Sequence, residues 1–227
     1  MLVRPSEEVP IARLLTFLEQ GERMAQACAK AQAALVADEE ERRFLFSQSR
    51  QEAGHAMIFQ GAIAWLAPKR IGTVSFLPAM EEYRKSLTDA LRRKALLETF
   101  LAEQVILEGL GEAVLARIDK GLAKRSVPFG RLRQILIHQE EAHHAFGCRQ
   151  LERAVDRGDV NLVCLREQAR EYLGLADTMI HALSDLFDAI DEDAALWAAD
   201  VPGYLPSWLT EGDRKSLGAE MSLQGTV

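Results

Sequence analysis

Long stretches without a helix-breaking residue are the feature of this sequence that most limits its fold. The 227 residues contain only seven prolines, and the segments between them are rich in Ala, Leu, Glu, Arg and Gln, which favour helices. Apolar residues recur in these segments at intervals of three and four, without the alternation that marks a strand. The sequence therefore predicts an all-α fold.

Five long helices are expected from this periodicity and from the positions of Pro and Gly. They cover about residues 8–36, 38–66, 88–122, 129–157 and 161–190, and a short helix after Pro78 runs into the third of them. The intervening loops contain no Pro-rich or Gly-rich linker. We therefore expect a single domain over residues 1–210, with residues 211–227 as a flexible tail.

Composition and charge argue against several classes of function. Lys and Arg number 27 against 34 Asp and Glu, so nucleic acid is not an expected partner. No run of about 18 apolar residues is present, and the first residues lack the apolar core of a signal peptide. We therefore expect a cytoplasmic protein with no membrane partner. The three cysteines lie far apart in the sequence, which argues against a disulfide framework or an iron–sulfur site.

One Glu-x-x-His motif lies in the second predicted helix. The segment SQSRQEAGHAMIF contains Glu52 and His55, which lie on the same helix face because they are three residues apart. Most other residues of the stripe through Glu52 and His55 are apolar, so both side chains should point into the bundle. A carboxylate and an imidazole at one point suit iron, manganese or zinc.

A second motif lies in the fourth predicted helix and can be interpreted in two registers. HQEEAHH, residues 138–144, contains Glu140 with His143 and Glu141 with His144. The stripe through the second pair continues with Ile137, Cys148, Leu151 and Val155. The stripe through the first pair includes Gly147 and Gln150. On this amphipathic argument we prefer Glu141 and His144 as the inward pair.

Buried motifs of this kind require compensating groups from the other two helices. The apolar stripe of the first helix carries one acid, Glu22, and that of the third carries two, Glu108 and Glu112. The midpoint of Glu22 and Glu52 falls at Ala37, and that of Glu108 and Glu141 falls in the turn at residues 124–125. Residues equidistant from a turn lie level in a helical hairpin, here roughly 20 to 25 Å from it. Glu112 fits this test nearly as well as Glu108.

The resulting constellation resembles the ferritin-like di-iron carboxylate superfamily. The resemblance rests on GERMA at residues 21–25, EAGH at 52–55, EG at 108–109 and EEAHH at 140–144. Length and helix order are more similar to the oxygenase and oxidase branch, which includes aldehyde-deformylating oxygenase, the ribonucleotide reductase small subunit and related hydroxylases. The resemblance implies a ferritin-like four-helix bundle with additional C-terminal helices.

The resemblance also favours one set of metal ligands. It supports Glu141 with His144 over the other register, and Glu108 over Glu112. The expected ligands are Glu22, Glu52, His55, Glu108, Glu141 and His144. Glu140 and Glu112 are then expected beside the ligands, and no catalytic residue is expected beyond the ligands themselves.

The function implied by the resemblance is that of a non-haem, O2-dependent oxidoreductase. Two iron ions, as an Fe/Fe or an Mn/Fe pair, would activate O2 to oxidise a small apolar organic substrate. Electrons would come from a separate donor, because the sequence carries no flavin, haem or iron–sulfur motif. A homodimer is compatible with this interpretation. The alternatives are a ferroxidase or peroxide-scavenging protein that handles iron, and a purely structural helical bundle.

Overall fold

The computed structural model describes residues 4–71, 78–124, 130–184, 187–188 and 193–209, and all regular structure in these ranges is helical. The longer elements are α1 (Glu8–Ala33), α2 (Glu39–Leu66), α3 (Pro78–Arg92), α4 (Leu96–Phe100), η3 (Leu101–Leu107), α5 (Glu108–Lys124), α6 (Gly130–Asp156), α7 (Leu162–His181) and α9 (Ala194–Asp200). Short 3-10 turns cover η1 (Pro5–Glu7), η2 (Pro68–Arg70) and η4 (Val201–Tyr204). The all-α prediction is confirmed. No helix among the described residues combines the length and apolar character that crossing a bilayer requires.

Side-chain caps begin two of the long helices where the sequence predicts a break. Asp38 precedes α2 and accepts hydrogen bonds from the backbone N–H groups of Glu40 and Glu41. The acidic residues of that first turn also lie at the positive end of the helix dipole. Asn161 accepts a hydrogen bond from the Val163 N–H at the start of α7 in the same way. These caps end the α1–α2 and α6–α7 connections and start the next helix.

A short helix does follow Pro78, but the predicted start of the third long helix near residue 88 and its direct continuation from the short helix are wrong. α3 ends at Arg92, and the chain turns at Lys94, whose φ of 55° lies in the left-handed region. A new helical segment then begins at Leu96. The break carries no Pro or Gly, so the residues that normally signal a helix end are missing from the sequence. The predicted fifth helix is interrupted, because α7 ends at His181 and a turn follows at residues 182–183. Residues 185–186 and 189–190 of its predicted span lie outside the described residues.

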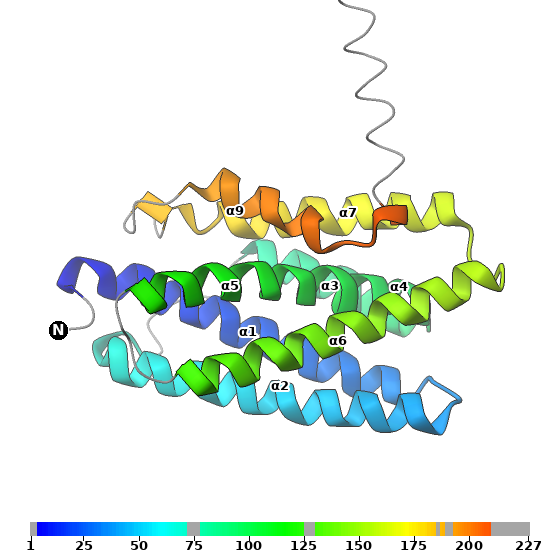
Figure 1. The fold of residues 1–227 in the computed structure, drawn as a ribbon, viewed down its shortest axis with the longest axis horizontal. Coiled ribbons are helices and arrows are strands. Elements are labelled where there is room, and N and C mark those ends of the chain that lie inside the picture. The colour runs from blue at the N-terminus through cyan, green and yellow to red at the C-terminus, as the bar shows by residue number, and fades with distance from the viewer. Residues whose placement is uncertain (1–3, 72–77, 125–129, 185–186, 189–192, 210–227) are drawn as a thin grey trace, which may run out of the picture.

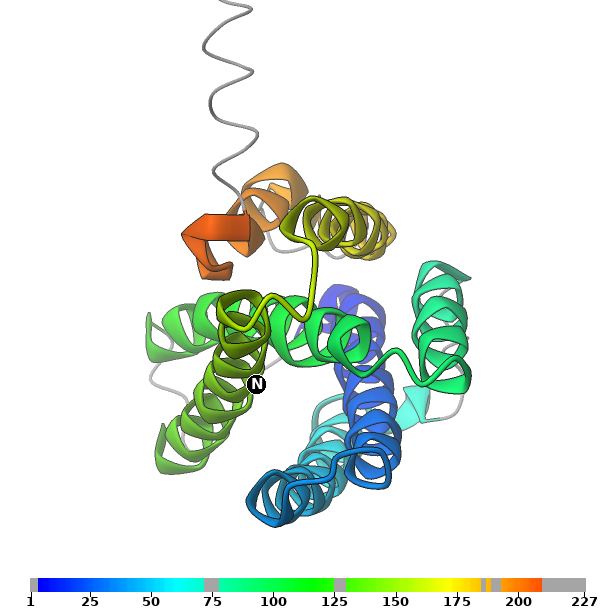
Figure 2. The same ribbon diagram turned by 90° about the vertical axis from the view of Figure 1, so that its right-hand side faces the viewer.

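Two long hairpins and an additional layer make up the molecule (Figure 1). α1 packs along α2, and α5 with η3 packs against α6. α7, α9 and η4 lie over α5 and η3 on the side away from α2, as the end-on view shows (Figure 2). Apolar residues from all these layers fill the interior, among them Leu45, Leu101, Ile106, Leu151 and Leu165, none of which is exposed. The centre of the four long helical segments is therefore shielded from solvent.

The segment η3 is a π-helix rather than an α-helix. At its end the Glu108 N–H bonds to the Glu103 carbonyl, five residues earlier, instead of the α-helical partner four residues earlier. All seven residues of η3 are buried. The wider turn places Glu103 and Glu108 on the same side of this helix.

α6 approaches the π-helix closely at Gly147. A Cβ atom at this position would overlap the Cβ of Gln104 and would lie 3.2 Å from both the backbone carbonyl carbon of Gln104 and a methyl group of Val105. The Gln104 backbone and the buried Val105 side chain have little freedom to move away from such an added atom. Glycine is therefore required at this crossing for steric reasons.

We predict that Gly147→Ala destabilises the protein by about 1–3 kcal/mol, because the added methyl group overpacks the α6–η3 contact. Gly174→Ala in α7 is the matched control, since a Cβ there meets nothing within 4 Å. That control should be neutral or up to about 1 kcal/mol stabilising, because Ala favours a helix over Gly. Denaturant unfolding of both variants measures the difference. Equal stability of the two would contradict the close crossing.

Candidate metal centre

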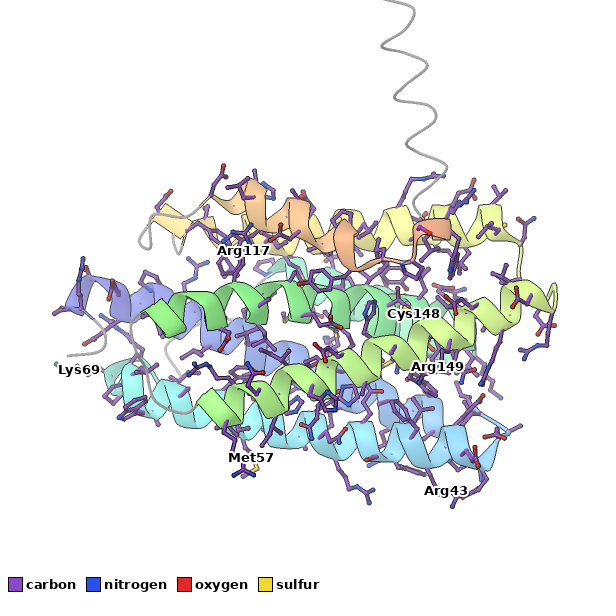
Figure 3. All side chains as sticks on the ribbon, viewed as in Figure 1. Arg43, Met57, Lys69, Arg117, Cys148 and Arg149 are labelled. Carbon is purple, nitrogen blue, oxygen red and sulfur yellow. The ribbon has the colours of Figure 1, made fainter. Side chains whose placement is uncertain are left out.

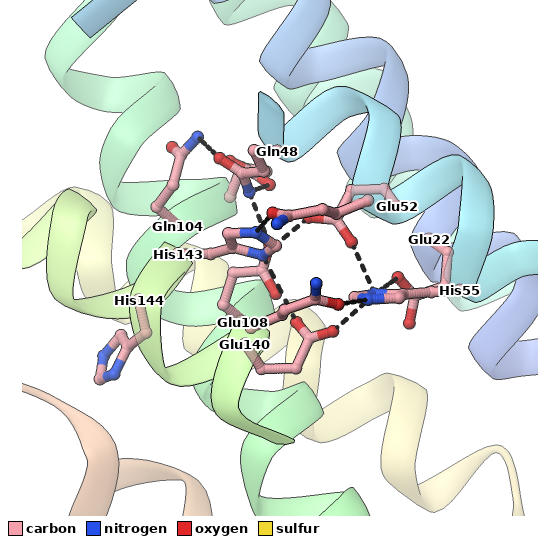
Figure 4. Close-up of polar contacts among 12 residues, drawn as sticks. Glu22, Gln48, Glu52, His55, Gln104, Glu108, Glu140, His143 and His144 are labelled. Atoms are coloured by element: carbon pink, nitrogen blue, oxygen red, sulfur yellow. Dashed lines mark hydrogen bonds and ion pairs between the residues drawn. The ribbon is translucent and has the colours of Figure 1, made fainter. Parts of the chain in front are cut away.

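Six ionisable side chains from four helical segments meet in the middle of the bundle (Figure 4). They are Glu22 from α1, Glu52 and His55 from α2, Glu108 from α5, and Glu140 and His143 from α6. Glu52 is 0% exposed and His143 is 1% exposed. Ionised groups at this depth are strongly unfavourable unless another charge compensates them.

The six residues form two overlapping groups, each able to hold one metal ion. The first consists of Glu22, Glu52, His55 and Glu140, and the second consists of Glu52, Glu108, Glu140 and His143. Within each group one ligand atom per residue lies within 4.8 Å of the others. Glu52 and Glu140 belong to both groups. This sharing is the arrangement that bridging carboxylates have between two ions.

Both imidazoles turn the same nitrogen towards the shared carboxylates. His55 Nδ1 lies 3.0 Å from Glu52 Oε2 and 2.9 Å from Glu140 Oε1. His143 Nδ1 lies 2.9 Å from Glu52 Oε1 and 3.9 Å from Glu140 Oε2. Each shared carboxylate therefore spans the two histidines, one oxygen to each.

The outer nitrogens of the two histidines contact amide oxygens. His55 Nε2 lies 2.7 Å from Gln139 Oε1, and His143 Nε2 lies 2.8 Å from Gln51 Oε1. An amide oxygen only accepts hydrogen bonds, so Nε2 carries the proton in both rings. Nδ1 faces the shared carboxylates in both rings, so it is the nitrogen that would bind a metal ion in place of a proton. A ring fixed in this way by an outer partner is the usual form of a metal-ligating histidine.

The electrostatics of the cluster show an excess of negative charge. Burial, together with the charge of Glu140, raises the pKa of both Glu22 and Glu108 well above the usual range. Burial lowers the pKa of His143, but its contacts with Glu140 and Glu52 outweigh this effect and raise the value to about 10. The cluster therefore attracts cations strongly, whether protons or metal ions.

Several buried atoms of the cluster face only other ionisable groups of the cluster and have no further hydrogen-bond partner among the described residues. They are both carboxylate oxygens of Glu52, Oε1 of Glu140 and Nδ1 of His143. Buried polar atoms are rarely left unpaired in folded proteins. Divalent cations between the shared carboxylates and the imidazoles would satisfy all of them at once. The donor set of carboxylate oxygens and imidazole nitrogens thus fits a pair of metal ions.

The prediction that Glu141 and His144 form the inward pair is wrong. The Glu141 side chain is 57% exposed and lies 3.5 Å from His138 Nδ1 on the surface. His144 points away from the cluster (Figure 4), with Nδ1 3.1 Å from Glu112 and Nε2 3.5 Å from the sulfur of Cys148. Figure 3 shows Cys148 on α6 beside α5, whereas Met57 lies on the outer side of α2.

The inward register of α6 is the one that contains the polar residues. Glu140, His143, Gly147 and Gln150 are all buried, with Gln150 only 8% exposed. The amphipathic argument treats Gly and Gln as surface residues. Here Gly147 is buried because α6 crosses η3 at that point, and Gln150 is buried on the same face. Glu140, predicted to lie beside the ligands, belongs to both groups instead.

The other predicted residues lie where the sequence indicated. Glu22, Glu52, His55 and Glu108 converge on the cluster, whereas Glu112 lies outside it against His144. The preference for Glu108 over Glu112 therefore agrees with their placement.

Sequence reasoning missed one carboxylate, Glu103, and one amide, Gln48, beside the cluster. Both are 0% exposed, and Gln48 Nε2 donates hydrogen bonds to Glu103 Oε1 and Glu108 Oε1, each at 2.9 Å. In an α-helix, residues five apart lie on different faces, so Glu103 would not accompany Glu108. The π-helix brings them together. The only signal in the sequence is an isolated Glu within the apolar run FLAEQVIL.

A small cavity borders the cluster. Its volume is about 40 Å³, and the carboxylates of Glu22, Glu108 and Glu140 line it. Most of the remaining lining is apolar and includes Phe17, Leu18, Met80, Leu107 and Val114. One water molecule needs roughly 10–15 Å³ by this kind of measure, so the cavity admits small molecules such as water or O2.

Comparison with known proteins identifies the fold. The sequence matches no family model and no curated protein. A solved structure described as protein 19 with aldehyde deformylating oxidase activity from Synechococcus resembles this chain with a TM-score of 0.74 and 16% identity, over 100% of both chains. At this identity the likeness shows the fold alone. The predicted ferritin-like helical fold with additional helices is confirmed.

We predict that a divalent cation stabilises the full-length protein, because it compensates the buried carboxylates. At 100 times its dissociation constant, one bound ion adds about 2.7 kcal/mol. Thermal unfolding with Fe²⁺ under anaerobic conditions, and again after chelation, measures the gain. Glu52→Gln should lose the gain, whereas Glu141→Gln, the same substitution at an exposed site, should keep it. A gain that survives Glu52→Gln unchanged would exclude this cluster as the binding site.

Proposed function

We propose that this chain is a non-haem di-iron oxidoreductase that uses O2 to oxidise a small apolar organic substrate. The observation that carries the proposal is the sharing of Glu52 and Glu140 between two metal-binding groups. A single-ion site would not need two shared carboxylates, and the four carboxylates of the two groups exceed the positive charge that their two imidazoles can supply as a salt-bridge network. The ferritin-like fold supports the proposal, since proteins of this architecture build such centres from facing helices.

Each residue of the cluster has a distinct place in the proposed centre. Glu22 and His55 would hold one ion, and Glu108 and His143 would hold the other. Glu52 and Glu140 would lie between the two. Four carboxylates balance the charge of two divalent ions, and carboxylate with imidazole suits an Fe/Fe or an Mn/Fe pair. Bound iron would supply the binding and reduction of O2, for which the protein has no side chain of its own.

The surrounding residues would control access to this chemistry. Gln139 and Gln51 orient the two imidazoles by accepting their outer N–H groups. Apolar side chains around the cavity exclude water from the carboxylates. The proposal includes a separate electron donor, as expected from the sequence.

One observation favours a second function, the handling of iron as a ferroxidase or peroxide scavenger. The cavity of about 40 Å³ admits a small molecule such as O2 and is far smaller than the roughly 300–1,000 Å³ of pockets that hold organic ligands. Oxidation of an organic substrate therefore requires the cavity to widen. Oxidation of iron does not.

Replacement of the two adjacent histidines tests the proposed ligand set. His143→Ala should lose iron and lower iron-dependent O2 consumption at least about 10-fold, because removing a ligand is more severe than removing its outer partner. His144→Ala should retain both, since His144 contacts Glu112 and Cys148 outside the cluster. Iron content per chain and O2 uptake with a chemical reductant measure both effects. Loss of iron in His144→Ala together with retention in His143→Ala would instead support Glu141 and His144 as the inward pair.

Product analysis separates the two functions. Iron-loaded protein is supplied with O2, a reductant and aldehydes of increasing chain length, chosen because the Synechococcus protein has aldehyde deformylating oxidase activity. O2-dependent loss of an aldehyde with formation of a new organic product supports the oxygenase or oxidase. Consumption of O2 in proportion to added Fe²⁺ alone, with every aldehyde recovered, supports iron handling.

A further inference from the structure

A chain of buried amides leads from the backbone of α4 to the proposed metal centre. Gln32 of α1, Gln104 of η3 and Gln48 of α2 are each 0% exposed and are linked in that order (Figure 4 shows the Gln104–Gln48 link). Nothing in the proposed chemistry uses them. Burying three glutamine side chains completely is unfavourable unless each of their amide donors and acceptors has a hydrogen-bond partner.

Each link in the chain has a defined direction. The Thr99 hydroxyl donates to the Leu96 carbonyl and accepts a hydrogen bond from Gln32 Nε2 at 3.2 Å. Gln32 Nε2 also donates to Gln104 Oε1 at 3.0 Å, and Gln104 Nε2 donates back to Gln32 Oε1 at 2.6 Å. Gln104 Nε2 further donates to Gln48 Oε1 at 3.2 Å. The oxygen of Gln48 is therefore turned towards Gln104.

The orientation of the Gln48 amide determines whether its Nε2 or its Oε1 faces the carboxylates. Its Nε2 has two protons, and they go to Glu103 Oε1 and Glu108 Oε1, each at 2.9 Å. A flipped Gln48 would place its oxygen against two carboxylates and its NH2 group against the NH2 group of Gln104. Both contacts are repulsive when Glu108 is ionised, as a metal-binding carboxylate is, so a single orientation is favoured in the proposed centre. The close α6–η3 crossing at Gly147 keeps Gln104 in place behind it.

We propose that Gln48 is a positioning residue for Glu108, held in its one useful orientation by the Gln104–Gln32 amide pair. Glu108 belongs only to the second group of metal-binding residues, and the two hydrogen bonds that Gln48 Nε2 donates go to Glu108 and to Glu103, neither of which belongs to the first group. Gln48 therefore acts on one of the two ions. Glu103 accepts a hydrogen bond from the other N–H of the same NH2 group. Both N–H groups of the Gln48 amide therefore have a fixed acceptor. The inference rests on the proposed function, because it concerns the second ion of that centre.

Stepwise titration of the metal-free, full-length protein with Co²⁺, followed by visible absorption and calorimetry, tests the proposal. Wild type should bind two ions per chain. Glu22→Ala and Glu108→Ala identify which step belongs to which group. Gln48→Met, which keeps the length of the side chain and removes its donors, should weaken the same step as Glu108→Ala by about 10-fold or more. The other step should be unchanged.

A double-mutant cycle distinguishes positioning from general damage to the bundle. Gln104→Met should weaken the same step less than Gln48→Met does. The double variant should bind no more weakly than Gln48→Met alone, because Gln104 acts only through Gln48. Gln150→Met is the matched control, since Gln150 is also buried and lies two turns beyond His143 on α6. It should leave both steps unchanged. If Gln48→Met does not fold, Gln104→Met tests the same claim with Gln48 in place.

The possible failures are distinguishable. Two unchanged steps in Gln48→Met, equal weakening of both steps, full additivity of the two Gln variants, or an equal effect of Gln150→Met would each overturn the positioning role and leave the proposed function standing. Failure of wild type to bind two ions would overturn the proposed function and this inference with it.

Discussion

The burial of carboxylates at the centre of a helical bundle is the constraint on which the rest of this structure depends. Glu52 and Glu140 lie where an apolar side chain would normally be, and neither can remain ionised there alone. The imidazoles of His55 and His143, fixed by outer amides, are the neighbours that compensate them. The helices around them are placed so that these groups meet, and the apolar core above and below keeps water from them.

This constraint explains which parts of the molecule follow from the sequence. Helix periodicity and capping residues predict the long helices, because they act locally and leave a pattern in composition. The level placement of Glu22 and Glu52 also follows from the sequence, because a helical hairpin has a fixed rise per residue. The break at Lys94 does not, since it lacks any residue that usually ends a helix.

The register of α6 shows where sequence reasoning reaches its limit. An amphipathic stripe identifies the inward face only if the interior is apolar. Around a polar centre the rule inverts, so Glu140 and His143 lie inward and Glu141 lies in solvent. The inward face of α6 is determined by a tertiary contact at Gly147, which has no side chain and so lets α6 cross close to η3. That requirement is visible only once both helices are placed.

The π-helix has a consequence for how this chain tolerates change in length. A π-turn holds one residue more than an α-turn, so it shifts the angular phase of everything that follows it along the same helix. Loss of a single residue between 101 and 107 would let the segment relax into an uninterrupted α-helix. If the lost residue lies between Glu103 and Glu108, the two are then four apart and still share one face of the helix. Relaxation of η3 to an α-helix with every residue retained would instead turn Glu108 and the rest of α5 by about 100° relative to Glu103, so a one-residue deletion is the change that this helix can absorb with its ligand-bearing face kept in place.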